Sequence, residues 1–144
     1  MGKYNNNKIV LDGITFDSKE EARYYEYLKT KRAAGEIQNY ELQPNYTLQP
    51  SFKRDGRTIR AITYTADFLV YHLDGSEEVI DVKGMETQQG IMRRKMFWCK
   101  YPDLKLTWIC RSLKFGDKDG WIEYDELKKR RRNGNSTKNN NWNV

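Results

Sequence analysis

The hexapeptide Val-Ile-Asp-Val-Lys-Gly at residues 79–84 places an acid and a base inside an apolar strand pattern. Side chains alternate across a strand, so Asp81 and Lys83 share one face. Apolar residues flank them on both faces, which predicts that the two charges are partly buried and therefore paired or metal-bound. The simpler alternative is an Asp–Lys ion pair on a strand that faces solvent.

A second acid, Asp67, lies in the apolar segment Thr-Tyr-Thr-Ala-Asp-Phe-Leu-Val-Tyr. The turn signal at residues 73–76 predicts that this segment and the hexapeptide pair as a hairpin, which would bring Asp67 near Asp81. Two carboxylates beside a lysine offer the hard oxygen ligands that suit Mg²⁺ or Mn²⁺. One histidine and two cysteines, without the spacing of metal ligands, argue against a zinc site and against a histidine triad.

The elements that must position these acids follow from periodicity and from turn signals. They are expected to be a hairpin over Ile9–Phe16, a helix over Lys19–Gly35, an extended region over Ile37–Phe52, strands over Ile59–Leu73 and Glu77–Lys83, a helix over Thr87–Lys100, a strand over Leu104–Cys110 and a helix over Ile122–Arg132. The order α-β-β-β-α-β predicts a small α/β domain with a mixed β-sheet flanked by helices. We expect one domain over residues 1–132 and a disordered, Asn-rich tail over residues 133–144.

The overall charge favours a polyanionic partner. The chain of 144 residues carries a formal net charge of +6 at pH 7, which suits nucleic acid. No apolar run has the length of a membrane span, and the N-terminus lacks the apolar core of a signal peptide. We therefore expect no membrane partner and a cytoplasmic location.

The motifs and their order resemble a known group of enzymes. Asp67 and the run Asp81-Val82-Lys83 match the second and third motifs of the PD-(D/E)XK nuclease superfamily, with Ala66 where the motif usually has proline. The succession Phe-Asp-Ser-Lys-Glu-Glu-Ala, Tyr-Thr-Ala-Asp-Phe, Val-Ile-Asp-Val-Lys-Gly and a helix with Lys95 resembles small phage-encoded endonucleases of the endonuclease I type of Holliday-junction resolvase. The resemblance spans about residues 14–110.

The resemblance implies a restriction-endonuclease-like core and a single nuclease domain. It implies an enzyme that hydrolyses DNA phosphodiester bonds with Mg²⁺, for which Mn²⁺ can substitute. It further implies branched DNA such as a Holliday junction as the substrate, a homodimer, and a role in phage recombination or replication in the bacterial host cytoplasm.

The superfamily often adds a glutamate from the first helix, and this sequence offers Glu20 and Glu21. Family phasing selects Glu21, which helical spacing aligns with Tyr25 and Leu28 on or beside the inward face. The alternative for Glu21 is structural, because Ser18-x-x-Glu21 is also a capping box that would bond the start of the helix. The other alternative is that Glu20 is the helix acid.

In the catalytic interpretation, Asp67 and Asp81 are the main metal ligands, and Glu21 completes the site directly or through water. The backbone carbonyl of Val82 is a further ligand. Lys83 orients or helps to deprotonate the attacking water and offsets phosphate charge. Crowded carboxylates disfavour their own ionisation, so a cation would relieve their repulsion.

Basic and polar residues further along the chain are candidates for DNA contacts, with a solvated surface as the alternative for each. The basic run in the last helix would anchor phosphates and make binding depend on salt. The candidates are Gln88 with its neighbours Thr87 and Gln89, then Arg93, Arg94 and Lys95, and then Lys128, Lys129, Arg130, Arg131 and Arg132.

Three other interpretations compete with a junction-cleaving enzyme. The first is a nuclease that acts on linear or single-stranded DNA ends, or one with restriction-like or transposon-end-cleaving activity. The second is a non-catalytic DNA-binding module that retains the fold, against which the complete set Glu21, Asp67, Asp81 and Lys83 argues. The third is a basic interaction protein whose acids only form salt bridges.

Overall fold

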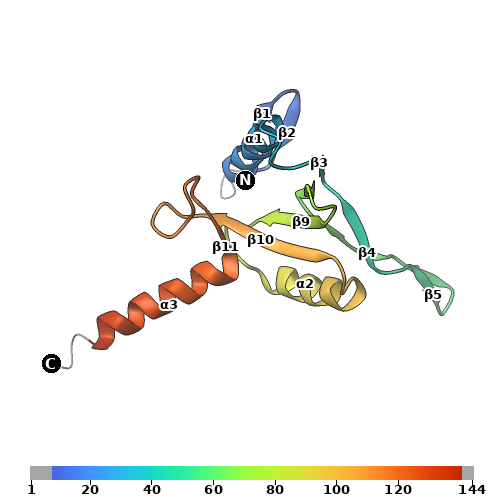
Figure 1. Cartoon of the computed structure of the whole chain (residues 1–144). Helices are drawn as coiled ribbons and strands as arrows, with labels where there is room; N and C mark the ends of the chain where they lie inside the picture. Colours follow the sequence, from blue (N-terminus) through green and yellow to red (C-terminus); the bar gives the residue numbers. More distant parts are fainter. Residues whose placement is uncertain (1–7, 141–144) are drawn as a thin grey trace.

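The computed structural model describes residues 8–140 of the chain, with side chains to residue 134. Its helices are α1 (Lys19–Ala33), α2 (Gln88–Lys100) and α3 (Tyr124–Asn140). Its strands are β1 (Ile9–Leu11), β2 (Ile14–Phe16), β3 (Asn39–Leu42), β4 (Asn45–Gln49), β5 (Phe52–Arg54), β6 (Arg57–Ile59), β7 (Ile62–Thr65), β8 (Phe68–Tyr71), β9 (Glu77–Val82), β10 (Lys105–Arg111) and β11 (Trp121–Glu123). Figure 1 shows their arrangement.

A five-stranded sheet forms the centre of the fold, with strand order β11-β10-β9-β8-β3. The strands β3, β8 and β9 are antiparallel neighbours, whereas β9 and β10 run parallel and are joined through α2. A parallel pair needs such a crossover, because a tight turn can only reverse the chain. The succession α1, β3, β8, β9, α2, β10 confirms the predicted α-β-β-β-α-β order and the mixed sheet of an α/β fold.

Helix α1 begins and ends at residues suited to those positions. Ser18 is its N-cap and accepts a hydrogen bond from the backbone N–H of Glu21 at 3.1 Å. At the other end Gly35 has a φ of +74°, and the Gly35 and Glu36 amides donate to carbonyls of the last turn, a Schellman arrangement. The buried face of α1 comprises Ala22, Tyr24, Tyr25 and Leu28.

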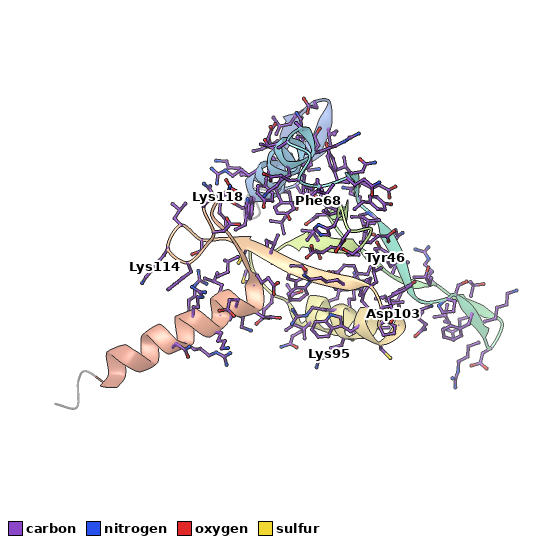
Figure 2. The ribbon with its side chains drawn as sticks, viewed as in Figure 1. Tyr46, Phe68, Lys95, Asp103, Lys114 and Lys118 are labelled. Carbon is purple, nitrogen blue, oxygen red and sulfur yellow. The ribbon has the colours of Figure 1, made fainter. Side chains whose placement is uncertain are left out.

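The two faces of the sheet pack against different helices. One core includes Phe68, Val70 and Ile80 together with the buried face of α1, and Figure 2 shows Phe68 between α1 and the sheet. The other core includes Leu69, Val79 and Phe97, the last of these from α2. Strands β8 and β9 therefore alternate between the two cores, as a sheet covered on both faces requires.

The predicted strand over Ile59–Leu73 is wrong in its extent, because this segment contains the end of β6, then β7 and then β8. Strand β7 pairs with β4 in a separate two-stranded sheet, whereas β8 pairs with β3 and β9. The change of partner occurs at Ala66 and Asp67, whose amides donate to the carbonyls of Pro44 and Ile80. Alternation of buried residues continues across the break, so the sequence pattern did not reveal it. The hairpin between β8 and β9 is confirmed.

The ends of the chain differ partly from expectation. The hairpin over Ile9–Phe16 is confirmed as β1 and β2. The helix expected from Ile122 begins instead at Tyr124, because residues 121–123 form β11 on the sheet edge. Helix α3 continues through residues 133–140 of the expected disordered tail, and residues 141–144 lie outside the described part. Within residues 8–140, no helix is long and apolar enough to cross a membrane.

Candidate active site

Asp67 is fixed at the point where the chain passes from β7 to β8. Its amide donates to the Ile80 carbonyl at 3.1 Å, and its Oδ2 accepts from the Val82 amide at 2.8 Å. The carboxylate therefore continues the β8–β9 ladder beyond the last residue pair, Phe68 with Ile80. This places Asp67 beside the end of β9 that carries the predicted acid and base.

Asp81 is 7% exposed and lies in a network of buried polar groups. Its Oδ2 accepts a hydrogen bond from the Tyr64 hydroxyl on β7 and lies 3.3 Å from Lys83 Nζ. The Tyr64 hydroxyl accepts in turn from Trp108 Nε1 at 2.9 Å. Trp108 is the residue opposite Asp81 on the parallel strand β10, and Lys83 Nζ lies 4.6 Å from the centroid of its ring. Asp81 and Lys83 are thus held by each other and by Tyr64 on β7 and Trp108 on β10.

Glu21 projects from the first turn of α1 toward Asp67. The two acids line a small cavity of about 120 Å³ together with Phe16 and Gln43. Burial, followed by the charges of Asp17 and Asp81, raises the pKa of Glu21 above its usual value, while hydrogen bonds from the Asp17 backbone and the Ser18 side chain lower it. Glu21 therefore lies within electrostatic reach of the aspartates and also bonds the helix start, and its metal-ligand role stays a prediction.

Among the acids of the cluster, Asp67 is the one whose pKa is shifted most. Burial raises its pKa well above the usual range, and the negative charges of Asp81 and then Glu21 raise it further. The hydrogen bond from the Val82 amide acts in the opposite direction but is outweighed. Three carboxylates share this region with Lys83 as the cation paired to Asp81. When all three acids are ionised the charge of the region is negative, and a bound cation would then reduce the repulsion.

Near Asp67 lie oxygen atoms of the kind that a hard divalent cation takes as ligands. In a strand, the N–H and C=O of one residue point to the same side. Since the Val82 N–H donates to Asp67, the Val82 carbonyl faces the Asp67 side and can join Asp67 and Asp81 as an oxygen ligand. No group of three or more His, Cys, Asp or Glu side chains in the described part of the chain is close enough together to hold an ion. Both cysteines are free thiols.

Glu20 has a different environment from Glu21. Its carboxylate lies 3.0 Å from Arg23 in an exposed i,i+3 ion pair. It also borders a groove of about 350 Å³ on another side of the cluster, whose cationic lining consists of Lys83, Arg111 and Arg131. Glu21, not Glu20, shares a cavity with Asp67.

The residues predicted to contact DNA fall into two groups. Gln88 and Lys95 are exposed on α2, and Figure 2 shows Lys95 on the outer side of that helix. Arg94 instead packs inward, with its guanidinium 3.8 Å from the centroid of Trp108 and 3.1 Å from Asp125, and Arg93 is half-buried beside it. Arg94 therefore supports the Trp108 side of the cluster.

The basic run on α3 is also mixed in its environment. Lys128 pairs with Glu86 at 2.8 Å, and Arg130 pairs with Glu126 at 3.1 Å within the helix. Lys129 and Arg131 are exposed, and Arg131 borders the groove beside Lys83. Arg131 is therefore the member of the run whose position best links α3 to the cluster.

A comparison with family models matches residues 1–117 to a family described as a protein of unknown function, DUF1064. The chain belongs to the DUF1064 family. The matched region contains Glu21, Asp67, Asp81 and Lys83, whereas the basic run of α3 lies beyond it. No curated protein matches this DUF1064 chain.

Sequence reasoning missed Tyr64, Trp108 and Arg111. Tyr64 lies three residues before Asp67, but its contact with Asp81 depends on the change of strand partner at Ala66. Trp108 meets the site through the register of two parallel strands, which no short motif encodes. The signal in the sequence that could have drawn attention to Trp108 is its aromatic side chain in the strand that follows α2.

Tyr64→Phe is expected to lower the free energy of unfolding by about 1–3 kcal/mol, because Asp81 loses a donor and the Trp108 N–H loses its acceptor in a buried site. Urea denaturation of the two proteins measures the difference. Tyr46→Phe is the matched control, since the Tyr46 ring packs against Phe97 in the same β4–β7 region. Equal losses in the two variants would contradict a special role of the Tyr64 hydroxyl.

Proposed function

We propose that this protein is a metal-dependent DNA endonuclease of the PD-(D/E)XK type with a restriction-endonuclease-like core. The observation that carries the proposal is the buried pairing of Asp67 and Asp81 beside Lys83, in which like charge and burial raise the pKa of Asp67. A pair of this kind costs folding free energy when ionised, and perturbed acids are typical of functional sites. We propose Mg²⁺ as the cofactor, with Mn²⁺ able to replace it.

Asp67, Asp81 and the Val82 carbonyl would hold the cation, and Glu21 would contribute directly or through water. When bound, the ion supplies an activated water and neutralises charge that develops on the phosphate. Lys83 is the group of this chain best placed to donate to a phosphate oxygen or to the attacking water. Its ammonium is held between Asp81 and the face of Trp108, so it is oriented before substrate arrives.

The charge balance favours this proposal over a purely structural set of ion pairs. A structural pair would match each buried acid with a base, whereas Asp67 and Glu21 add negative charge to a region where Lys83 pairs with Asp81. Removing ions from water costs several kcal/mol per ion, so such a cluster either keeps a proton, as the raised pKa of Asp67 indicates, or binds a cation. A non-catalytic DNA-binding module would have no use for that arrangement.

The substrate and assembly follow from the resemblance and from charge. We propose branched DNA such as a Holliday junction, cut by a homodimer in the cytoplasm of a phage-infected bacterium. The groove lined by Lys83, Arg111 and Arg131 leads from the cluster toward α3 and would accept the phosphate backbone. Linear or single-stranded DNA ends are the second candidate substrate, because the same cations would contact any DNA backbone.

A cleavage assay with Mg²⁺ tests the proposal on a four-way junction, a flap, a linear duplex and a single strand. We expect the junction to be cut fastest and EDTA to stop cutting. Lys83→Ala is expected to slow cleavage by about 10² at saturating DNA, as for loss of one transition-state donor. Absence of cleavage on every substrate would refute the nuclease, whereas equal cutting of junction and linear duplex would refute only the preference for branches.

A further inference from the structure

A projecting β-hairpin has no role in the cluster described above. We name residues 51–61 the basic arm; it contains β5 and β6, joined by a turn at Asp55 and Gly56 with φ values of +52° and +74°. Positive φ at both central residues gives the two-residue turn whose twist matches a hairpin. Figure 1 shows β4 and β5 leading away from the body of the molecule.

The basic arm gains no stability from packing on the body. Every residue from Ser51 to Ala61 is exposed, including the cross-strand pair Phe52 and Ile59, at 43% and 38%. A two-stranded hairpin alone is marginally stable in water. An apolar pair exposed at the base of such an arm indicates a surface that a partner covers.

Charge identifies the chemistry of that partner. The arm carries four cations and one acid, which are Lys53, Arg54, Arg57, Arg60 and Asp55. Arg54 lies directly opposite Arg57 in the strand register, so two like charges face each other. Asp55 offsets little of this repulsion, because its carboxylate lies 3.9 Å from the Arg54 side chain and both side chains are largely exposed. A polyanion would remove the repulsion, whereas a second copy of the same arm would add to it.

The arm is continuous with the carboxylate cluster. The strand that leaves it, β7, carries Tyr64, whose hydroxyl bonds Asp81, and Asp67 follows directly. At about 3.3 Å per residue, Arg57 can lie up to about 33 Å from Asp67 along this path. That length corresponds to about ten base pairs of DNA at about 3.4 Å each.

We infer that the basic arm binds duplex DNA that flanks the scissile phosphate, by placing its two-stranded ribbon against the backbone and the major groove. This inference rests on the proposed nuclease function for its geometry, because it takes the cluster as the point of cleavage. A two-stranded ribbon fits the major groove. Arg54 and Arg57 would contact phosphates, and Phe52 and Ile59 would face sugars or bases.

The test compares DNA binding by Asp81→Asn protein, which is expected not to cut, with and without the added pair Arg54→Gln and Arg57→Gln. Fluorescence anisotropy would use substrates whose flanking duplexes are about 5 or about 20 base pairs long, and salt would be varied. We expect the arm substitutions to weaken binding of the long substrate roughly 10-fold. They should also make the slope of log K against log salt concentration less steep by about 2, as the loss of two phosphate contacts predicts. Binding of the short substrate should not change.

Two controls make the outcome specific. The pair Lys114→Gln and Lys118→Gln removes the same charge from exposed residues of the β10–β11 loop, labelled in Figure 2, and should affect both substrates equally and weakly. The second control uses the protein with an intact Asp81, in which the arm substitutions should raise the DNA concentration that gives half-maximal single-turnover cleavage of the long substrate and not that of the short one.

Equal weakening on short and long substrates, or none on either, would overturn the role of the arm while leaving the nuclease intact. Conversion of a dimer to a monomer by the arm substitutions in sedimentation, with DNA binding unchanged, would overturn it too and assign the arm to a second copy. Failure of the wild type to cleave any DNA would instead refute the proposed function, whatever the arm variants bind.

Discussion

Asp81→Asn is expected to reduce the rate of Mg²⁺-dependent DNA cleavage by a factor of at least about 10². Even residues that only hydrogen-bond to the ligands of a metal can change activity by that factor when they are mutated. The substitution keeps the shape of the side chain and an oxygen that can accept from Tyr64, but it removes the charge that would hold a cation beside Asp67. Single-turnover cleavage of the best substrate measures the rate, and isothermal titration with Mn²⁺ measures the loss of the metal.

Asp103→Asn is the matched control for this experiment. Asp103 is an exposed acid between α2 and β10, labelled in Figure 2, and its removal changes the net charge by the same amount. We expect Asp103→Asn to cut at the wild-type rate. DNA binding by Asp81→Asn should be retained or improved, because a negative charge is lost near the phosphate path. A cleavage rate for Asp81→Asn like that of the wild type would exclude Asp81 from the reaction.

Asp67→Asn is expected to stabilise the metal-free protein at pH 8, with a rise in Tm of about 3 °C for a gain of roughly 1 kcal/mol in a domain of this size. Burial and the charges of Asp81 and Glu21 raise the pKa of Asp67 in the folded state, so its ionised form costs folding free energy. Asparagine carries no charge, and its carbonyl oxygen can still accept from the Val82 amide. Differential scanning fluorimetry from pH 3.5 to 8.5 would follow the difference in Tm.

The direction with pH follows from proton linkage. The unfolded carboxyl titrates near 3.8, whereas the folded one keeps its proton to higher pH. Above about pH 4 the folded state binds more protons, so the wild type loses stability relative to the variant as pH rises through the folded pKa. Below about pH 4 the two proteins should melt alike.

Two further measurements support this pH experiment. Excess Mg²⁺ should raise the Tm of the wild type and not that of Asp67→Asn, because a ligand stabilises only the state that binds it. Asp55→Asn, at the exposed tip of the basic arm, should change Tm little at any pH. A lower Tm for Asp67→Asn at pH 8 would mean that its carboxylate is stabilising, contrary to the charge balance described above.

Local sequence signals predicted the framework of the fold because they act over short range. The cap at Ser18, the glycine after α1 and the turn before β9 are each encoded within a few residues, and the order α-β-β-β-α-β followed from them. The partner of each strand is not encoded in this way. Buried residues alternate from Tyr64 through Ala66 to Phe68, across the break, yet β7 and β8 belong to different sheets.

The same distinction applies to the candidate site. The proximity of Asp67 to Asp81 could be predicted, because a hairpin fixes which residues face each other. Tyr64 and Trp108 could not, since one depends on a change of sheet and the other on the register of a parallel pair joined through α2. The sequence offers Arg94 as a candidate DNA contact, but stacking on Trp108 buries most of its side chain. The catalytic and DNA-contact roles stay predictions.

The exposure of every residue of the basic arm has a consequence for how such a protein can diversify. Since residues 51–61 touch no core, their length and charge can change in evolution without a penalty to the rest of the fold. The β4–β7 pair beneath them lacks that freedom, because Tyr64 supports Asp81. The proposed DNA contacts of the arm and the proposed chemistry of the cluster are therefore separable: an engineer could transplant a different hairpin between Pro50 and Ile62 and leave Asp67, Asp81 and Lys83 undisturbed.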